Sequence, residues 1–73
     1  MTDRLWEYLE IELDKPCSYI IVDTEYGAFV VEPIFSTDGR IIDFSVSHGS
    51  YYTTVREEPD IWFWEEIEKA LLK

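Results

Sequence analysis

The feature that most constrains this chain is the pair Asp38-Gly39, which separates two segments of alternating apolar residues within the stretch 29–48. Asp-Gly in this setting is typical of a two-residue type I′ turn, because both central residues of that turn need a positive φ. We therefore predict a β-hairpin in which Thr37 faces Arg40, and this pair sets all the others.

The predicted register gives the hairpin one apolar face and one mixed face. On the apolar face the pairs are Phe35 with Ile42, Pro33 with Phe44, Val31 with Val46, and Phe29 with His48. On the mixed face they are Ser36 with Ile41, Ile34 with Asp43, Glu32 with Ser45, and Val30 with Ser47. A slip of one residue would exchange the two faces of one strand, so the turn and the hydrophobic pattern support the same register.

A further strand is expected before the hairpin. The run 17–22 is rich in β-branched and aromatic residues, and a loop over 23–27 joins it to the hairpin. Pairing Val22 with Ala28 places Ile21 opposite Phe29, on the core face, and Tyr19 falls on the same face.

Another strand is expected after the hairpin. A tight turn at Gly49, with either His48 or Ser50 as its second central residue, leads to a strand over 51–55. Both choices give the same core-facing residues, which are Tyr51, Thr53 and Val55.

Helical periodicity marks both ends of the chain. Thr2 is the expected N-cap of a first helix that reaches about Asp14, before Pro16. Its buried stripe comprises Leu5, Trp6, Leu9 and Leu13. A second helix is expected to begin at Pro59 or Asp60 and to run nearly to the end of the chain. Its apolar face comprises Phe63, Trp64, Ile67, Ala70 and Leu71.

These elements predict an α+β fold and a single domain over residues 1–73, in the order α-β-β-β-β-α. The sheet is expected to be a four-stranded antiparallel meander, with the N-terminal and C-terminal helices on the apolar face of the hairpin. Four Phe, five Tyr and three Trp supply the core of this small domain.

The chain offers little of the chemistry that enzymes use. Cys17 and His48 are its only cysteine and histidine, and they fall on different predicted elements. The sequence has no glycine-rich phosphate loop, no metal-ligand spacing and no Ser/His/Asp set. We therefore expect no enzyme activity, no catalytic residue, no metal and no cofactor.

The charge of the chain restricts its partners. Sixteen acidic and six basic side chains give a formal net charge of −10. This charge repels nucleic acids and anionic membranes, so we expect neither to bind directly and we favour a basic protein partner. The N-terminus is acidic where a signal peptide is basic, and no apolar run is long enough to span a membrane, which predicts a cytoplasmic location.

Four carboxylates form a predicted acidic row on the first helix: Asp3, Glu7, Glu10 and Asp14. The row could be the solvated side of an amphipathic helix. However, such a side usually mixes lysine with glutamate, and like charges four residues apart repel by a few tenths of a kcal/mol. At ~1.5 Å rise per residue the carboxylates are about 4.5 to 6 Å apart, so the row could imitate a phosphate backbone.

Trp62 falls on the polar side of the second helix. It lies with Glu66 and close in sequence to three further acids, Glu57, Glu58 and Asp60. One interpretation is a first-turn residue that folds back as a hydrophobic staple. The other is a partner-binding anchor, because tryptophan is enriched at binding hot spots and the acids suit an arginine-rich surface.

The mixed face of the sheet is a second candidate interface. Its apolar residues are predicted to be Ile20, Val22, Val30, Ile34 and Ile41, with Ala28 beside them. Since both helices are expected on the other face, either one helix crosses over or chains associate here. We favour association, as a possible homodimer, because a 73-residue domain gains stability from it.

In size and charge the chain resembles small anti-CRISPR proteins, phage DNA mimics and nuclease-immunity proteins. The resemblance lies in composition and not in a motif. It implies an inhibitor, encoded by a phage or mobile element, that blocks a basic nucleic-acid-binding surface of a host defence complex. The alternative is a homo-oligomeric structural or regulatory adaptor that uses the mixed face of the sheet.

Overall fold

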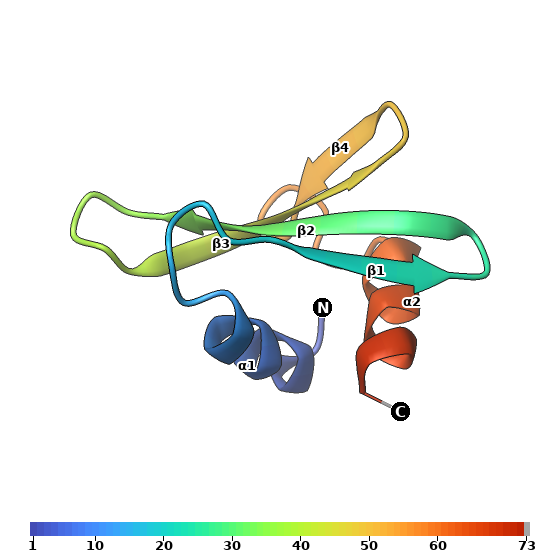
Figure 1. Ribbon diagram of the computed structural model, residues 1–73, viewed down its shortest axis with the longest axis horizontal. Helices are drawn as coiled ribbons and strands as arrows, with labels where there is room; N and C mark the ends of the chain where they lie inside the picture. Colours follow the sequence, from blue (N-terminus) through green and yellow to red (C-terminus); the bar gives the residue numbers. More distant parts are fainter. Residues whose placement is uncertain (73) are drawn as a thin grey trace.

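The computed structural model describes residues 1–72, which form one sheet and two helices (Figure 1). The elements are α1 (Asp3–Glu12), β1 (Ile20–Thr24), β2 (Gly27–Phe35), β3 (Ile41–His48), β4 (Tyr51–Thr54) and α2 (Trp62–Leu71). The strands are antiparallel and lie in the order β1-β2-β3-β4. The predicted α+β fold and the order α-β-β-β-β-α are therefore confirmed.

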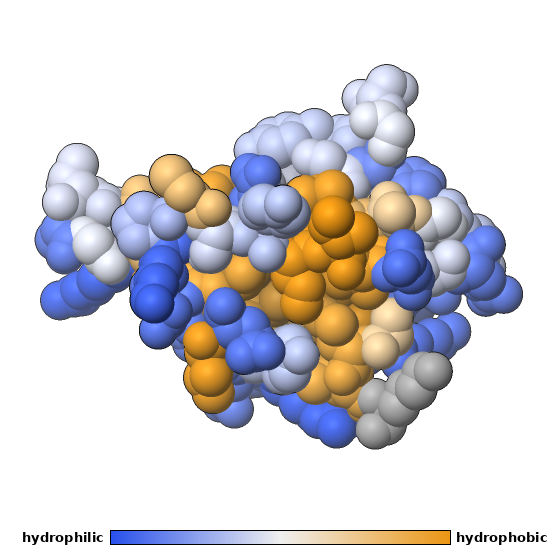
Figure 2. All heavy atoms as spheres, in the orientation of Figure 1, coloured by the Kyte–Doolittle hydropathy of each residue, from blue (hydrophilic) through white to orange (hydrophobic). Residues whose placement is uncertain are grey.

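The core lies between the sheet and both helices, which cover the same sheet face (Figure 1). Its fully or almost fully buried members are Leu5, Leu9, Leu13, Val22, Phe29, Val31, Phe44, Val46, Phe63, Trp64 and Ile67. Trp6 of α1 adds an edge-on contact to Phe44, with ring centroids 4.7 Å apart. The apolar face predicted for the hairpin is thus the face that the helices cover. Figure 2 shows this apolar layer reaching the surface between β1 and the helices.

The turn between β2 and β3 differs from the prediction. The Gly39 amide donates to the Ser36 carbonyl at 3.0 Å, and the Ser36 amide donates to the Arg40 carbonyl at 2.7 Å. Gly39 has a φ of +87°, but Asp38 does not have a positive φ. The loop therefore contains the three residues from Thr37 to Gly39 and ends in a left-handed glycine, so the predicted type I′ turn is wrong.

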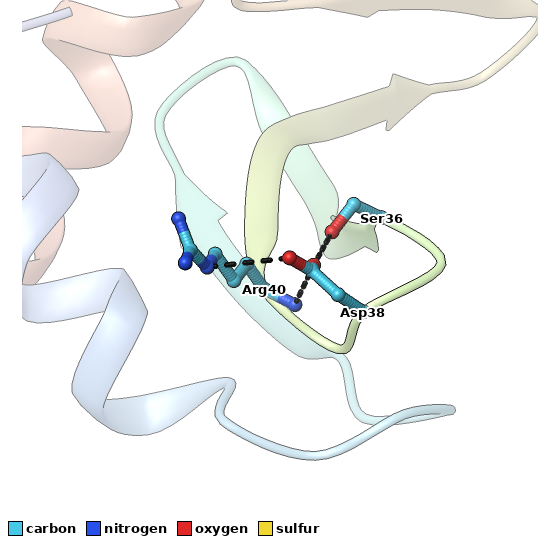
Figure 3. A network of polar contacts seen from close by, with 3 residues as sticks. All are labelled: Ser36, Asp38 and Arg40. Atoms are coloured by element: carbon cyan, nitrogen blue, oxygen red, sulfur yellow. Dashed lines mark hydrogen bonds and ion pairs between the residues drawn. The ribbon is translucent and has the colours of Figure 1, made fainter.

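The side chain of Asp38 holds this turn together. Its carboxylate accepts hydrogen bonds from the Ser36 hydroxyl and the Arg40 amide, and it lies 3.4 Å from the Arg40 guanidinium (Figure 3). The Ser36 hydrogen bond, followed by the Arg40 amide, lowers the pKa of Asp38 below its ordinary value. The aspartate thus serves as an acceptor for turn backbone and side chain, and not as a residue with positive φ.

A bulge restores the predicted register beyond this turn. Phe35 pairs with Ile41 instead of Ile42, and the register shifts between Ile34 and Phe35. The extra turn residue moves the pairing by one position, and the unpaired Ile42 moves it back. From Ile34 to Val30 the pairs with β3 are therefore the predicted ones.

The turn between β1 and β2 is shorter than predicted. Thr24 pairs with Gly27, which leaves a two-residue loop in place of the expected loop over 23–27. The Thr24 hydroxyl accepts a hydrogen bond from the Tyr26 amide and donates one to the Gly27 carbonyl, each at 3.0 Å. Gly27 adopts a φ of +107°, which a residue with a side chain rarely does.

This shorter turn displaces β1 by one residue, so the prediction of its faces is wrong. Val22 pairs with Phe29 instead of Ala28 and is only 2% exposed in the core. Tyr19 and Ile21, which were expected in the core, are 61% and 56% exposed. A displacement by one position exchanges the two faces of a strand, and no bulge corrects it here.

The remaining boundaries are set by local hydrogen bonds. β1 does not begin at Cys17 as predicted, because residues 15–18 form a turn in which the Ser18 amide donates to the Lys15 carbonyl and Cys17 has a φ of +66°. β3 and β4 are joined by Gly49 and Ser50, with His48 opposite Tyr51, so the alternative with Ser50 is the correct one.

The helices begin in different ways. Thr2 caps α1 as predicted, because its hydroxyl accepts a hydrogen bond from the Leu5 amide at 3.2 Å. α2 begins at Trp62 and not at Pro59 or Asp60, since the preceding residues form turns, and its N-cap Ile61 makes no side-chain hydrogen bond. The indole of Trp64 instead donates to the Glu58 carbonyl at 3.1 Å.

Candidate protein-binding surfaces

The acidic row lies on the solvent side of α1. Leu5 and Leu9 turn the opposite side of the helix into the core. Asp3, Glu7 and Glu10 are exposed, and Asp14 is exposed as well, although it follows the end of the helix at Glu12. Three of the four carboxylates therefore share one rigid helix face, and the fourth extends from its end.

An apolar residue that the sequence analysis did not assign to any surface lies beside this row. Ile11 follows Glu7 by four residues, which places the two side chains next to each other on α1. Ile11 is 74% exposed and is the most exposed large apolar side chain of residues 1–72. The sequence signal for it was its failure to fit the buried stripe of the helix.

The start of α1 lies against the segment that precedes α2. The amino group of Met1 donates to the Pro59 carbonyl, and the Thr2 hydroxyl donates to the Glu68 carboxylate. These contacts bring Asp3 to the same end of the molecule as Asp60, which is exposed in the turn before α2.

Glu58 is bound within the protein, whereas Glu57 is exposed. The Tyr51 hydroxyl donates a hydrogen bond to the Glu58 carboxylate, which lowers the pKa of Glu58 and raises the pKa of Tyr51. The Glu58 amide also donates to the Thr54 carbonyl at 3.0 Å. The charge of Glu58 is thus held in place by β4 beneath it.

Trp62 is part of an aromatic cluster and is still 46% exposed. Its ring lies edge-on to Tyr26 in the β1–β2 loop, with centroids 4.9 Å apart, and edge-on to Phe63 at 4.4 Å. Tyr26 is itself more than half exposed and was not recognised in the sequence, because it lay in a segment interpreted only as a loop. The packing of Trp62 and its exposure combine features of both sequence interpretations.

Glu66 lies on the same side of α2 as Trp62, but its charge is already balanced. Its carboxylate is 3.3 Å from the Lys69 ammonium, and its side chain is only 14% exposed. The Glu66 hydrogen bond and charge raise the pKa of Lys69, and Glu25 in the neighbouring loop adds to this effect.

The outer face of the sheet, away from the helices, differs in composition from the prediction. Of the five residues expected there, Val22 is in the core, and Ile20 and Ile41 pack against the core. Val30 and Ile34 are half-buried. For β1 the displacement described above exchanges the faces, and for Ile41 the neighbouring bulge has the same effect.

Other apolar residues take their place on the outer face. Ile21, Val30, Ser47 and Tyr52 are successive cross-strand partners, so they form one row across all four strands. Ile21 and Tyr52 are both more than half exposed. The outer face therefore carries an apolar row among polar residues, and only the register of β1 reveals that Ile21 belongs to it.

The structure keeps the candidate surfaces apart. Glu68, on one side of α2, contacts Thr2 at the start of α1, whereas Trp62, on the other side, contacts Tyr26. The acidic row and the tryptophan are thus separate surfaces on either side of α2. Asp60 is linked to the start of α1 through the adjacent Pro59, whose carbonyl accepts a hydrogen bond from the Met1 amino group.

His48 has a structural role in the described residues. Its Nδ1 lies 3.1 Å from the Ala28 carbonyl, and its ring stacks on Phe29 with centroids 4.3 Å apart. Cys17 is exposed in the turn before β1. Among residues 1–72, no three His, Cys, Asp or Glu side chains come together in a group that could hold a metal ion.

No helix within the described part of the chain is long and apolar enough to cross a membrane. Comparison of the chain with protein-family models, with curated proteins and with solved structures found no match.

Proposed function

We propose that this protein is a stoichiometric inhibitor, of the anti-CRISPR or nucleic-acid-mimic type, that binds a basic nucleic-acid-binding surface of a host defence complex. In this proposal a phage or mobile element encodes it, and it acts in the cytoplasm of the host cell. Its acidic row occupies positions that phosphates of the nucleic acid would otherwise take.

The observation that carries the proposal is the unpaired state of the acidic row. The two ion pairs within residues 1–72 are Arg40 with Asp38 and Lys69 with Glu66, and neither involves α1. Carboxylates without an internal cation are available to arginine and lysine side chains of a partner. Ile11, exposed beside Glu7, adds an apolar contact to this charged surface.

The test is competition with nucleic acid for a panel of CRISPR effector complexes and other DNA-binding defence complexes. The fluorescence anisotropy of a labelled target duplex reports how much DNA each complex releases when the protein is added. The variant Glu7→Lys/Glu10→Lys should lose at least tens- to thousands-fold in affinity, because even one broken charge pair in a desolvated interface costs about 2 to 5 kcal/mol. Inhibition by the wild type should also weaken steeply with salt.

A matched control separates the acidic row from total charge. The variant Glu12→Lys/Glu65→Lys changes the net charge by the same amount, at exposed positions outside the row and outside the other candidate surfaces. It should keep most of the inhibition. Equal loss in both variants, or full inhibition by Glu7→Lys/Glu10→Lys with a flat response to salt, would reduce the row to a solvated helix face.

The outer face of the sheet supports the second candidate function, a homo-oligomeric adaptor. The observation in its favour is the apolar row that contains Ile21, Val30 and Tyr52. Static light scattering over a concentration series tests it, with Val30→Lys/Tyr52→Lys as the variant expected to remain monomeric. A monomeric wild type at high concentration would exclude this candidate.

A further inference from the structure

β1 is an edge strand whose outer side is open. In the sheet order β1-β2-β3-β4 it is the first strand, and within residues 1–72 it pairs with β2 alone. An unpaired strand edge is a template onto which another chain can add a strand. The position of β1 in the sheet therefore raises the question of which of its backbone groups are free.

The hydrogen-bonding pattern identifies the free groups. The two-residue loop closes on Thr24 and Gly27, and the hydrogen-bonded pairs of an antiparallel ladder alternate from such a closing pair. The pairs made by Val22 and Ile20 are then the next hydrogen-bonded ones. The N–H and C=O groups of Ile21 and Asp23 consequently point away from β2, to the open edge.

β2 contains an independent check of this pattern. Its odd-numbered residues direct their backbone groups toward β1, and Pro33 is one of them. Pro33 has no N–H, and it lies beyond Val31, which is the last partner of β1. The missing donor therefore falls where no strand is present, as the pattern requires.

β1 lacks three of the features that usually protect a sheet edge, namely lysine, proline and a bulge. Edge strands are commonly blunted by lysine, by proline, by a bulge or by short length. Residues 20–24 contain no lysine, arginine or proline, and the pairing of β1 with β2 shows no register shift. Figure 2 shows apolar surface between β1 and the helices, below this edge. Ile20 of β1, and Ala70 and Leu71 of α2, are only partly buried against the core.

The charges around the edge determine which chain fits it. Asp23 and Glu25 are exposed at one end of β1, Glu32 is exposed on the neighbouring strand, and the charge of Lys69 is paired with Glu66. A second copy of the protein would bring the same carboxylates to the interface. An extended basic segment would instead bring cations to them.

We propose that the open edge of β1 binds an extended basic segment of the partner, which adds to the sheet as a fifth strand. Its backbone bonds to the free groups of Ile21 and Asp23. Its apolar side chains lie over Tyr19 and Ile21, and its arginine or lysine side chains reach Asp23 and Glu25. This inference rests on the proposed function for the basic nature of the partner, but it concerns a surface separate from the acidic row.

The probe is a synthetic ten-residue peptide in which threonine alternates with valine in one half and with arginine in the other half, so that valine and arginine share one face. The same peptide with glutamate in place of arginine is its control. Titration followed by ¹⁵N NMR should show that the basic peptide slows amide exchange at Ile21 and Asp23, whereas the acidic peptide has no effect. The variant Ile21→Pro removes the outward N–H but no bond to β2, which an edge position tolerates. It should weaken peptide binding about tenfold, the effect of one lost hydrogen bond.

A matched variant and a chemical control complete the test. Ile21→Ala keeps the N–H and loses only side-chain contact, so it should bind more tightly than Ile21→Pro. The peptide can also be N-methylated, either at its odd-numbered or at its even-numbered amides, while the protein is left unchanged. One of these two patterns should abolish binding, and the other should not affect it. Equal effects of both methylation patterns, or peptide shifts confined to α1, would overturn the proposal.

Two further outcomes separate this inference from its alternatives. A wild type that sediments as a dimer, with monomeric Ile21→Pro and no peptide binding, would assign the edge to a second copy and overturn the proposal. In the competition assay, inhibition could be weakened by Glu7→Lys/Glu10→Lys but not by Ile21→Pro. This result would support the proposed function and would show that the β1 edge takes no part in it. The reverse pattern would retain the edge and reject the acidic row.

Discussion

The two hairpin turns that frame β2 deviate from prediction in opposite ways. Between β2 and β3 the loop is one residue longer than expected, but the unpaired Ile42 returns the strands to their predicted pairing. Between β1 and β2 the loop is shorter than expected, which displaces the pairing by one residue, and no bulge along the two strands corrects this displacement. The first deviation exchanges only Ile41 and Ile42 and leaves Phe29, Val31, Phe44 and Val46 in the core, whereas the second exchanges the faces of a whole strand.

Whether a turn changes the pairing by an odd or an even number of residues therefore matters more than the type of the turn. The side-chain period of a strand is two residues, so an odd displacement turns every side chain to the other face unless a bulge compensates for it. In β1 both alternations are apolar, since Ile20 and Val22 alternate with Tyr19 and Ile21. Hydrophobicity alone therefore could not choose between the two faces of this strand.

The largest difference in stability should separate two variants of β1, one with an aspartate on the core face and one with an aspartate on the outer face. Val22→Asp places an unpaired carboxylate in the core, which costs about 3 to 5 kcal/mol and unfolds a marginally stable domain. Ile21→Asp changes an exposed side chain and should cost about 1 kcal/mol or less. Urea denaturation followed by tryptophan fluorescence measures both. Equal stabilities, or the reverse order, would restore the register predicted from the sequence.

The two turn glycines should differ by a smaller amount. Gly39→Ala forces a side chain into a left-handed conformation, at about 1 to 2 kcal/mol, but the new Cβ would meet nothing within 4 Å. Gly27→Ala meets a φ of +107° and also places its Cβ 3.1 Å from His48 Cε1. Gly27→Ala should therefore be the more destabilising of the two in thermal unfolding. A larger loss at Gly39 would indicate that the contact with His48 relaxes freely.

The smallest effects should come from the polar side chains that hold the turns, and they should differ in their response to pH. The pKa of Asp38 is lowered in the folded protein, so its contribution to stability is present above its ordinary value of 3.8 and is lost as the pH falls through the folded value. Asp38→Asn should therefore be less stable than the wild type at neutral pH, with a difference that shrinks in acid.

Thr24→Ala is the matched control for this pH effect. The two hydrogen bonds of Thr24 are solvent-exposed and should together contribute about 1 kcal/mol, and the threonine hydroxyl does not titrate. The difference between Thr24→Ala and the wild type should therefore be the same in acid as at neutral pH. Urea denaturation of both variants at the two pH values decides whether Asp38 acts as a charged acceptor.

The candidate surfaces were predictable to different degrees. The exposure of Asp3, Glu7 and Glu10 follows from helical periodicity, because Leu5 and Leu9 fix which side of α1 is buried. The pairing of Glu66 with Lys69 is also local, because the two residues lie three positions apart on one helix. The state of Glu58 does not follow from any local pattern, since its partner Tyr51 is identified only when β4 is placed beside the segment before α2.

The order of the elements, the fold class and the apolar face of the β2–β3 hairpin beyond its turn all follow from the sequence. Alternation, the Thr2 cap and the glycine at position 39 are properties of neighbouring residues, so they act whatever the rest of the chain does. Tertiary structure decided the faces of β1 and the start of α2. Val22 is in the core because β1 packs against β2 and lies over α2. These choices depend on contacts between distant segments, which compete with local patterns that allow more than one answer.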